Sequence, residues 1–227
     1  TFITVLAIIY SIEHLPEPKS PKGFLALILV LETGMNGTFV ALDLILFFVF
    51  FEIVLLPMYF MIGIWGDKTV RTVSGFKNQI ETRLYASIKF FVFTLFGSAF
   101  MLLGFLGLYY RGNKTFSIPE LIELGTSGAF TGTFATLVFA VLFLGFAVKV
   151  PMWPLHTWLP DAHTAAPTVG SVLLAAILLK LGSYGFVRIA IPILPEQAKA
   201  WAPAIAILSA IGIIYGSLAC LAQTDLK

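Results

Sequence analysis

The sequence predicts an all-α membrane protein that crosses the bilayer several times. Hydrophobic residues make up 59% of the 227 residues and charged residues only 11%, compared with roughly 25% charged residues in a soluble globular domain. The apolar residues also fall in runs of about 20, which is the length that a helix needs to cross a bilayer. Lipid rather than water is therefore the expected main solvent of this chain.

Seven apolar runs are the expected membrane segments, and the first is too short to cross a bilayer. They are Thr1–Tyr10, Gly23–Val40, Leu44–Trp65, Tyr85–Tyr110, Ala129–Val148, Thr168–Ile191 and Trp201–Ala222. As one helix, residues 23–65 would measure about 64 Å, twice the hydrocarbon thickness of a bilayer, so a turn is expected near 37–43. We expect residues 1–227 to be one partial membrane domain of about seven segments. It is expected to be truncated at both ends, because an apolar run opens the chain and a polar turn closes it.

The stretch that follows the fifth run is unusually rich in proline. It contains Pro151, Pro154, Pro160 and Pro167. Proline removes a backbone donor, and a helix that breaks at membrane depth is tolerated only where it faces protein or a water-filled cavity. We therefore expect a discontinuous span, with Ala129–Val148 continuing through a break near Lys149–Pro151 into a half-helix that ends near Asp161–His163.

Basic residues are divided unequally between the two sides of the expected bundle. One side holds Lys19, Lys22, Lys68, Arg71, Lys77, Arg83 and Lys227, whereas the other holds Arg111, Lys114 and Lys199. By the positive-inside rule, the first side faces the cytoplasm or the equivalent compartment of an organelle. A short surface helix at Phe116–Leu124 is expected on the other side.

Ionisable residues inside the apolar runs are the candidate functional groups. Each costs about 2.5–3.5 kcal/mol at mid-membrane, so it needs a partner or a function. Glu52 and Lys180 lie near the middle of their runs, and Lys149 lies at the expected break. Burial favours the neutral form of a lysine and a nearby carboxylate favours the charged form, so a Glu–Lys pair can load and release a proton. Fixed structural ion pairs are the alternative, but desolvation largely offsets their attraction.

His156 and His163 are candidate proton relays, because an imidazole titrates near neutral pH. They could instead satisfy carbonyl groups that the prolines leave free. Glu32 is a weaker candidate, since it could face a neighbouring helix or hydrogen-bond Thr33. The remaining polar and aromatic residues have structural interpretations. Asp43 and Asp161 are expected as helix caps or local partners, and Trp65, Trp158, Trp201, Tyr109 and Tyr110 as interfacial anchors.

Several other functions are disfavoured by the sequence. The net charge of +2 does not indicate a nucleic-acid partner. Neither a phosphate-binding loop nor a zinc-protease motif occurs, and Cys220 is the only cysteine, which leaves no disulfide or cysteine cluster within the chain. His156 and His163 are separated by Pro160 and lack a third ligand, which argues against a metal site.

The strings around these residues resemble the antiporter-like membrane subunits of respiratory complex I. They are 48–60 around Glu52, 146–151 around Lys149, Pro-Leu-His-Thr-Trp-Leu-Pro-Asp-Ala-His at 154–163, 167–171, and 178–180 around Lys180. The resemblance extends from about Gly34 to the end of the chain. It implies that Glu52 and Lys149 form a switch pair and that Lys180 is the central proton station. It also implies an exit group on a later broken helix, beyond Lys227.

The resemblance further implies a proton-translocating subunit that couples quinone reduction to proton pumping. NADH, FMN, iron–sulfur clusters and quinone are expected in partner subunits, and no cofactor is expected in this chain. The expected partners are other membrane subunits, including neighbouring antiporter-like ones, and the expected location is a bacterial inner membrane rather than a mitochondrial one. Because the superfamily also contains multisubunit Na⁺/H⁺ antiporters and membrane-bound hydrogenases, a subunit of one of these is the alternative. A scaffold with fixed ion pairs is a third possibility.

Overall fold

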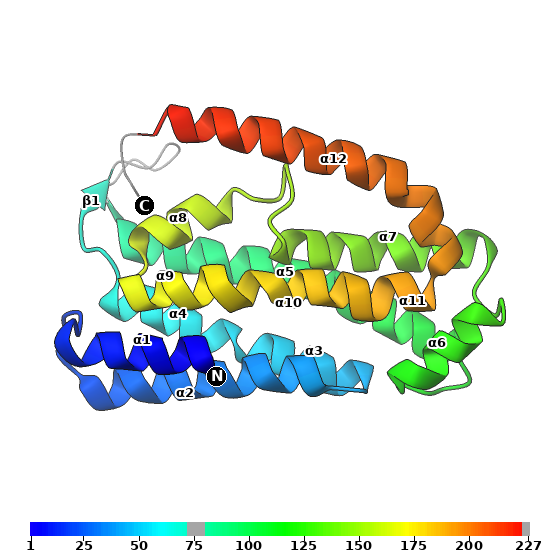
Figure 1. Cartoon of the computed structure of the whole chain (residues 1–227), viewed down its shortest axis with the longest axis horizontal. Coiled ribbons are helices and arrows are strands. Elements are labelled where there is room, and N and C mark those ends of the chain that lie inside the picture. The colour runs from blue at the N-terminus through cyan, green and yellow to red at the C-terminus, as the bar shows by residue number, and fades with distance from the viewer. Residues whose placement is uncertain (72–79, 224–227) are drawn as a thin grey trace.

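The computed structural model describes residues 1–71 and 80–223, and helices dominate this part of the chain (Figure 1). The α-helices and the two short strands are α1 (Phe2–Glu13), α2 (Pro21–Val40), α3 (Leu44–Ile53), α4 (Leu55–Trp65), β1 (Val70–Arg71), β2 (Ile80–Glu81), α5 (Thr82–Arg111), α6 (Ile118–Thr126), α7 (Gly132–Lys149), α8 (Trp158–Ala165), α9 (Thr168–Leu173), α10 (Leu179–Gly185), α11 (Ile191–Ile193) and α12 (Pro195–Leu221). Two π-helical segments, η1 (Leu174–Leu178) and η2 (Phe186–Ala190), join α9, α10 and α11 into one long rod.

Six helical stretches in the described residues are long and apolar enough to cross a membrane. They are Pro21–Val40, Leu44–Trp65, Thr82–Arg111, Gly132–Lys149, Thr168–Ile193 and Pro195–Leu221. The predicted polytopic α-helical fold class is therefore confirmed. Helix α1 is also apolar but has only 12 residues, too few to cross a bilayer alone.

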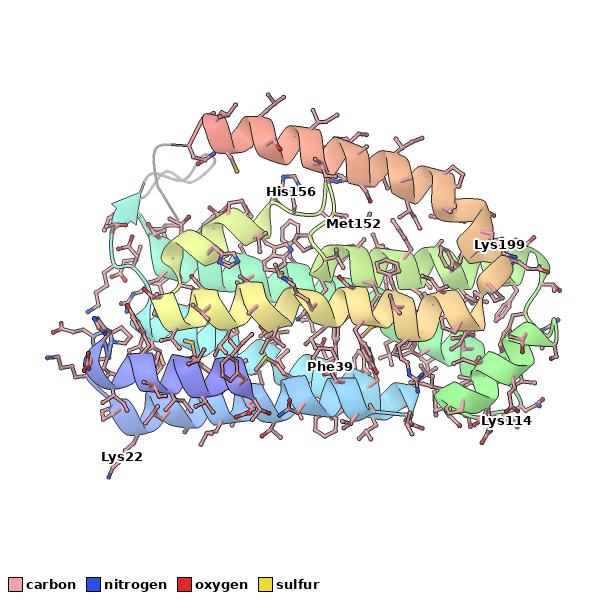
Figure 2. The ribbon with its side chains drawn as sticks, viewed as in Figure 1. Lys22, Phe39, Lys114, Met152, His156 and Lys199 are labelled. Carbon is pink, nitrogen blue, oxygen red and sulfur yellow. The ribbon has the colours of Figure 1, made fainter. Side chains whose placement is uncertain are left out.

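The helices lie roughly along one long axis, and most of their connections gather at the two ends of the bundle (Figure 1). Lys22 lies at one end, whereas Lys114 and Lys199 lie at the other (Figure 2). These positions agree with the two sides predicted from the loop charges. Lys77 and Lys227 from the same prediction lie outside the described residues.

The predicted turn between the second and third apolar runs is present at residues 41–43. Asp43 caps α3 as expected, because its Oδ1 accepts hydrogen bonds from the backbone N–H groups of Ile45 at 2.9 Å and Leu46 at 3.0 Å. The Leu44 N–H donates to the carbonyl of Phe116, so the turn also fixes the start of α6. This short helix corresponds to the surface helix predicted at Phe116–Leu124.

Small residues allow α5 and α7 to approach closely. A Cβ added at Gly145 of α7 would lie 2.8 Å from the backbone oxygen of Gly97 in α5, and one at Gly97 would lie 2.8 Å from the Val148 Cβ. Glycine at such contacts is typical of membrane helix pairs, whose association depends on close packing. This contact positions the end of α7, where the helix breaks.

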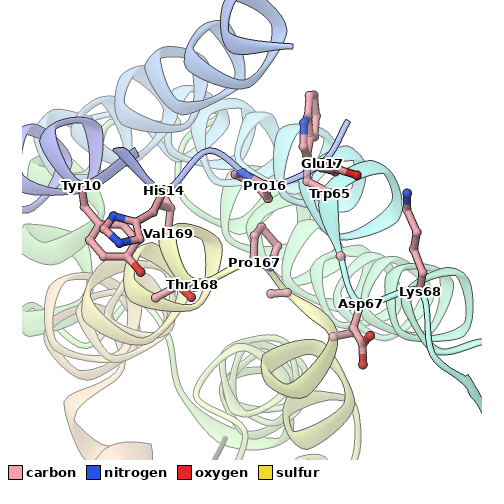
Figure 3. A pocket seen from close by; sticks show the side chains of 13 residues that line it. Tyr10, His14, Pro16, Glu17, Trp65, Asp67, Lys68, Pro167, Thr168 and Val169 are labelled. Atoms are coloured by element: carbon pink, nitrogen blue, oxygen red, sulfur yellow. The ribbon is translucent and has the colours of Figure 1, made fainter. Parts of the chain in front are cut away.

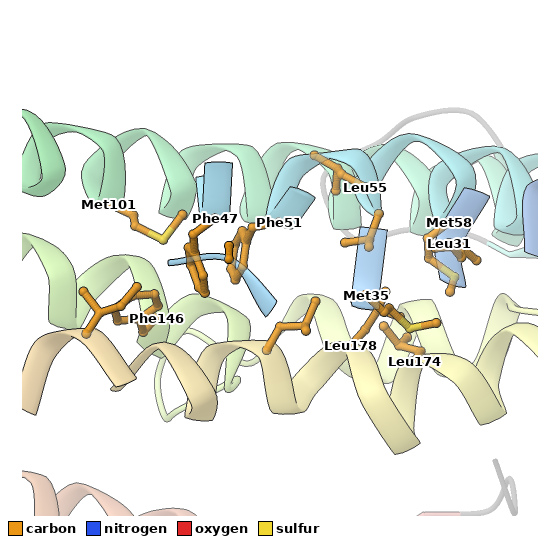
Figure 4. Packing of buried hydrophobic residues seen from close by; sticks show 14 of the residues in the cluster. Leu31, Met35, Phe47, Phe51, Leu55, Met58, Met101, Phe146, Leu174 and Leu178 are labelled. Carbon is orange, nitrogen blue, oxygen red and sulfur yellow. The ribbon is translucent and has the colours of Figure 1, made fainter. Parts of the chain in front are cut away.

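Buried hydrophobic side chains pack together inside the bundle, and Phe47, Phe51 and Phe146 are among them (Figure 4). The Phe47 ring lies 5.6 Å from that of Phe51, 6.1 Å from that of Phe105 on α5 and 6.3 Å from that of Phe146 on α7. All four rings are buried. The cluster therefore joins α5 and α7 to α3, the helix that also carries Glu52.

Two features of the membrane segments differ from plain straight helices. The segment Leu44–Trp65 is interrupted at Val54, between α3 and α4, because Pro57 has no N–H for the carbonyl of Ile53. The segment Thr168–Ile193 contains the two π-helical segments η1 and η2.

Helix α12 runs apart from the other helices (Figure 1), and Gln197 is its one buried residue in the part of the chain that the structure describes.

Candidate functional site

The break predicted after the apolar run Ala129–Val148 is present, near the middle of the bundle's length (Figure 1). Helix α7 ends at Lys149, residues 150–157 form turns, and α8 resumes at Trp158 and ends at Ala165. The loop between the two half-helices extends toward α12 (Figure 1). The sequence therefore predicted both the position of the break and the end of the second half-helix.

Trp158 supports this break rather than anchoring the chain at the membrane surface. Its side chain is fully buried, and its indole Nε1 donates to the carbonyl of Val148 at 3.0 Å. In a continuous helix the Met152 N–H would bond that carbonyl, but here it donates to the carbonyl of Ala147. The prediction of an interfacial role was thus wrong, because a carbonyl left free inside the membrane needs a donor. Trp65 is also buried, and its Nε1 donates to the carbonyl of Pro18 at 2.8 Å.

Lys149 is the last residue of α7, and only 3% of it is exposed. Its Nζ lies 4.7 Å from the centroid of the Phe51 ring on α3. Gly182 of α10 covers it from another side, since a Cβ there would lie 3.0 Å from the Lys149 Cβ. A cation at a helix C-terminus is stabilised by the helix dipole, so α7 itself favours a charge at this position.

Glu52 follows Phe51 directly and is half-buried near the end of α3. Its carboxylate interacts electrostatically with Lys149 and faces the hydroxyl of Ser98 on α5. Among the described residues, the ion pairs within 4.0 Å are Thr1–Glu32, Arg83–Glu81 and Lys89–Asp161. Glu52 and Lys149 therefore interact through their charges without a direct ion pair among the described residues, and the Phe51 ring contacts the Lys149 ammonium.

The two histidines occupy different elements. His156 lies in the break, and its ring meets that of Tyr215 on α12 edge-on at 5.2 Å (Figure 2). The buried Nδ1 of His156 has no hydrogen-bond partner among the described residues. His163 lies on α8, and its carbonyl accepts a hydrogen bond from the Ser171 hydroxyl at 3.1 Å. One predicted relay, His156, thus lies just before α8, and the other, His163, lies within α8 near its end.

Lys180 does not face the interior of the described bundle, although its place near the middle of an apolar run predicts an inward orientation for a charged side chain. Its side chain is exposed, and its Nζ donates to the carbonyl of Ala175 in η1 at 2.6 Å. The rod buries Leu178, Leu181 and Gly182, so Lys180 falls on the opposite stripe. Ser183 and Val187 of that stripe line a groove of about 730 Å³ between the rod and α12.

One ion pair was not predicted from the sequence. Lys89 of α5 donates to Asp161 of α8 at 2.6 Å, although the two residues are 72 positions apart. Asp161 is therefore not the helix cap or local partner that the sequence predicts. The available signal was Lys89 itself, a charged residue within the apolar run Tyr85–Tyr110. Glu32, in contrast, lies 3.6 Å from the amino group of Thr1.

A polar pocket of about 430 Å³ lies at the end of the bundle where α8 joins α9 (Figure 3). Its ionisable lining residues are Tyr10, His14, Glu17, Asp67 and Lys68. It brings titratable groups to the side predicted to be cytoplasmic. Within the described residues, no three His, Cys, Asp or Glu side chains are placed to hold a metal ion.

A bundle of apolar helices, with ionisable side chains at a helix break inside it, defines a polytopic membrane protein of the ion-transporter type. The chain belongs to the family described as NADH:quinone oxidoreductase/Mrp antiporter, transmembrane, which matches residues 41–227. This assignment agrees with the resemblance inferred from the strings around Glu52, Lys149 and Lys180.

Known relatives carry names from the same family. The chain is 46% identical over 215 residues to NADH-quinone oxidoreductase subunit M of Rhodobacter capsulatus, covering 91% of this chain and 39% of the relative. It is 41% identical to NADH-ubiquinone oxidoreductase chain 4 of Mycosarcoma maydis, covering 100% of this chain and 43% of the relative. One chain in the structure of respiratory complex I from Thermus thermophilus with bound NADH matches with a TM-score of 0.77 and 34% identity, over 89% of this chain and 40% of that chain. The present chain thus spans about two fifths of the length of the relatives it matches.

Proposed function

We propose that this chain is a proton-translocating part of subunit M of a membrane NADH–quinone oxidoreductase. The observation that carries the proposal is Lys149, buried at a helix break and close enough to Glu52 for their charges to interact. A buried lysine of this kind costs several kcal/mol unless it has a partner or a function. The names of the relatives support the choice of enzyme complex.

The first step in the proposed mechanism is a change in the separation of Glu52 and Lys149. Closer approach of the carboxylate favours the charged ammonium, and withdrawal leaves burial to favour the neutral amine. Because Phe51 lies between the two helices and contacts the ammonium, a small movement of α3 relative to α7 changes both interactions. Lys149 thereby takes up and releases a proton.

Further groups extend the path on both sides of Lys149. His163 and the polar pocket connect α8 to the side predicted to be cytoplasmic, and His156 connects the break to α12. Lys180 is proposed as the next proton station, on the stripe of the rod whose residues Ser183 and Val187 line the groove beside α12. The alternating charge states of these groups move a proton along the chain of sites.

The chain is proposed to hold no redox cofactor of its own. NADH, FMN, iron–sulfur clusters and quinone belong to partner subunits, and neighbouring antiporter-like subunits complete the membrane part. A bacterial inner membrane is the proposed location, and a mitochondrial inner membrane is the second candidate. The family also includes Mrp antiporters, so a Na⁺/H⁺ antiporter subunit is the alternative function.

Glu52→Gln tests the proposal in the full-length subunit within its complex. The amide keeps the size of the side chain but has no titratable charge, so NADH-driven proton pumping in inside-out membrane vesicles should nearly vanish while the complex remains assembled. Glu123→Gln on the exposed side of α6 is the matched control and should pump normally. Wild-type pumping by the Glu52 variant would remove it from the mechanism. Cation exchange that needs no NADH and requires Na⁺ would favour the antiporter alternative.

A further inference from the structure

The Lys89–Asp161 ion pair connects α5 to the second half of the broken helix. The two charged groups are 2.6 Å apart, and the side chains are 20% and 38% exposed. Lys89 also lies over the Tyr85 ring, with its Nζ 5.5 Å from the ring centroid. This is a charge pair between the membrane helix α5 and the half-helix α8.

The same face of α8 makes a second contact with α5. Three positions before Asp161, the Trp158 ring packs against that of Phe90, the residue after Lys89, with the centroids 5.4 Å apart. Ala162 and Ala165 are buried on the same face. Because α8 has only eight residues, these contacts determine where it lies.

Helix α8 in turn holds the residue before Lys149. The Trp158 indole donates to the carbonyl of Val148, and Lys149 follows in the chain. A shift of α8 relative to α5 therefore moves the hydrogen-bond donor that supports the end of α7. The position of the Lys149 ammonium relative to Phe51 and Glu52 depends on that end.

We propose that the Lys89–Asp161 ion pair is a positioning element of the proton path, which holds α8 against α5 and, through Trp158 and Val148, sets the position of Lys149. The proposal rests on the proposed function, because it assigns the pair a role in the same proton transfer. Neither Lys89 nor Asp161 carries the proton in this assignment. They act through Lys149.

A purely structural clamp is the competing explanation. Such a pair would affect assembly but not the dependence of pumping on pH. A positioning pair would change that dependence, since the charge state of Lys149 depends on its distance from Glu52. The two explanations therefore differ in a measurable property of assembled complexes.

The experiment uses the full-length subunit in the intact complex, in inside-out membrane vesicles. The variants are Lys89→Gln, Asp161→Asn, Lys89→Arg, and the charge swap Lys89→Asp with Asp161→Lys. Glu81→Gln removes the Glu81–Arg83 pair at the start of the same region, 2.7 Å apart, and serves as the matched control. Protons pumped per NADH oxidised are measured across neutral pH, together with the amount of assembled complex.

Both single neutral variants should lower the pumping ratio about fivefold and shift its pH profile by about half a pH unit. Lys89→Arg should pump like the wild type, because a guanidinium keeps the pair. The swap should recover at least half of the lost pumping, and Glu81→Gln should have no effect.

Unchanged pumping and an unchanged pH profile in both single variants would overturn the proposal. If Glu52→Gln still abolishes pumping in that case, the proposed function stands and only the positioning role fails. If instead Glu52→Gln pumps normally, the proposed function itself fails. Should the single variants not assemble, the charge swap decides. A swap that assembles and pumps with a shifted pH profile supports the proposal, whereas a swap that pumps with the wild-type pH profile, does not pump or does not assemble overturns it.

Discussion

The ammonium of Lys149 lies 4.7 Å from the centre of the Phe51 ring, and Glu52 is the next residue after Phe51. The Phe51 ring therefore contacts the Lys149 ammonium, while the carboxylate of the next residue, Glu52, interacts with the same charge. A desolvated cation–π contact contributes about 2 kcal/mol, which is comparable to the effect of moving a nearby charge. The balance between the two forms of Lys149 thus depends on the aromatic ring as well as on Glu52.

Replacing Phe51 with leucine should weaken proton pumping without preventing assembly. The leucine keeps an apolar core residue but removes the contact with the ammonium. The loss of this contact favours the neutral amine of Lys149 by about 2 kcal/mol. Proton pumping per NADH oxidised in membrane vesicles is the measurement. Phe48→Leu, on the same helix, is the control and should pump normally. Equal pumping by the two variants would mean that the ring does not act on Lys149.

Gly182→Ala should disturb the same site from the opposite side. The added methyl group would lie 3.0 Å from the Lys149 Cβ and 2.8 Å from a methyl carbon of Val150, so the end of α7 must move. Pumping should fall several-fold at normal complex content. Gly170→Ala is the control on the same rod, because the nearest atom is the flexible Met61 sulfur at 3.1 Å. An active Gly182 variant would show that the end of α7 tolerates displacement.

Lys180→Arg separates a proton station from a structural hydrogen bond. Arginine can keep a bond to the Ala175 carbonyl but cannot release a proton near neutral pH. We expect an assembled complex that does not pump, measured in vesicles with NADH as the donor. Wild-type proton flux in this variant would make Lys180 a structural residue.

Asp43→Ala should destabilise the turn between α2 and α3. The loss of two N-cap hydrogen bonds to Ile45 and Leu46 costs about 1 kcal/mol. The measurement is the temperature at which half of the detergent-solubilised complex loses its native state, which should fall. Asp43→Asn keeps an acceptor at the cap and should lie close to the wild type. An unchanged midpoint in the alanine variant would show that the cap adds nothing to stability.

The sequence by itself determined the features that depend on local chemistry. Apolar runs of about 20 residues are expected to be helices in lipid, since a helix satisfies its backbone groups within its own segment. Proline acts on its own helix, so the break after Lys149 and the half-helix ending near His163 were both predictable. The turn capped by Asp43 follows from the same local rules, and the strings around Glu52 and Lys149 indicated the family.

Only the tertiary structure decided which face of each helix meets its neighbours. Two π-helical segments alter the register of the rod that carries Lys180, so its orientation could not be derived from its depth in the sequence. The Lys89–Asp161 pair joins residues 72 positions apart, and no local pattern relates them. Trp158 is buried because the broken helix folds back onto a free carbonyl at Val148. In each case the outcome depends on packing between helices or half-helices that a single segment does not specify.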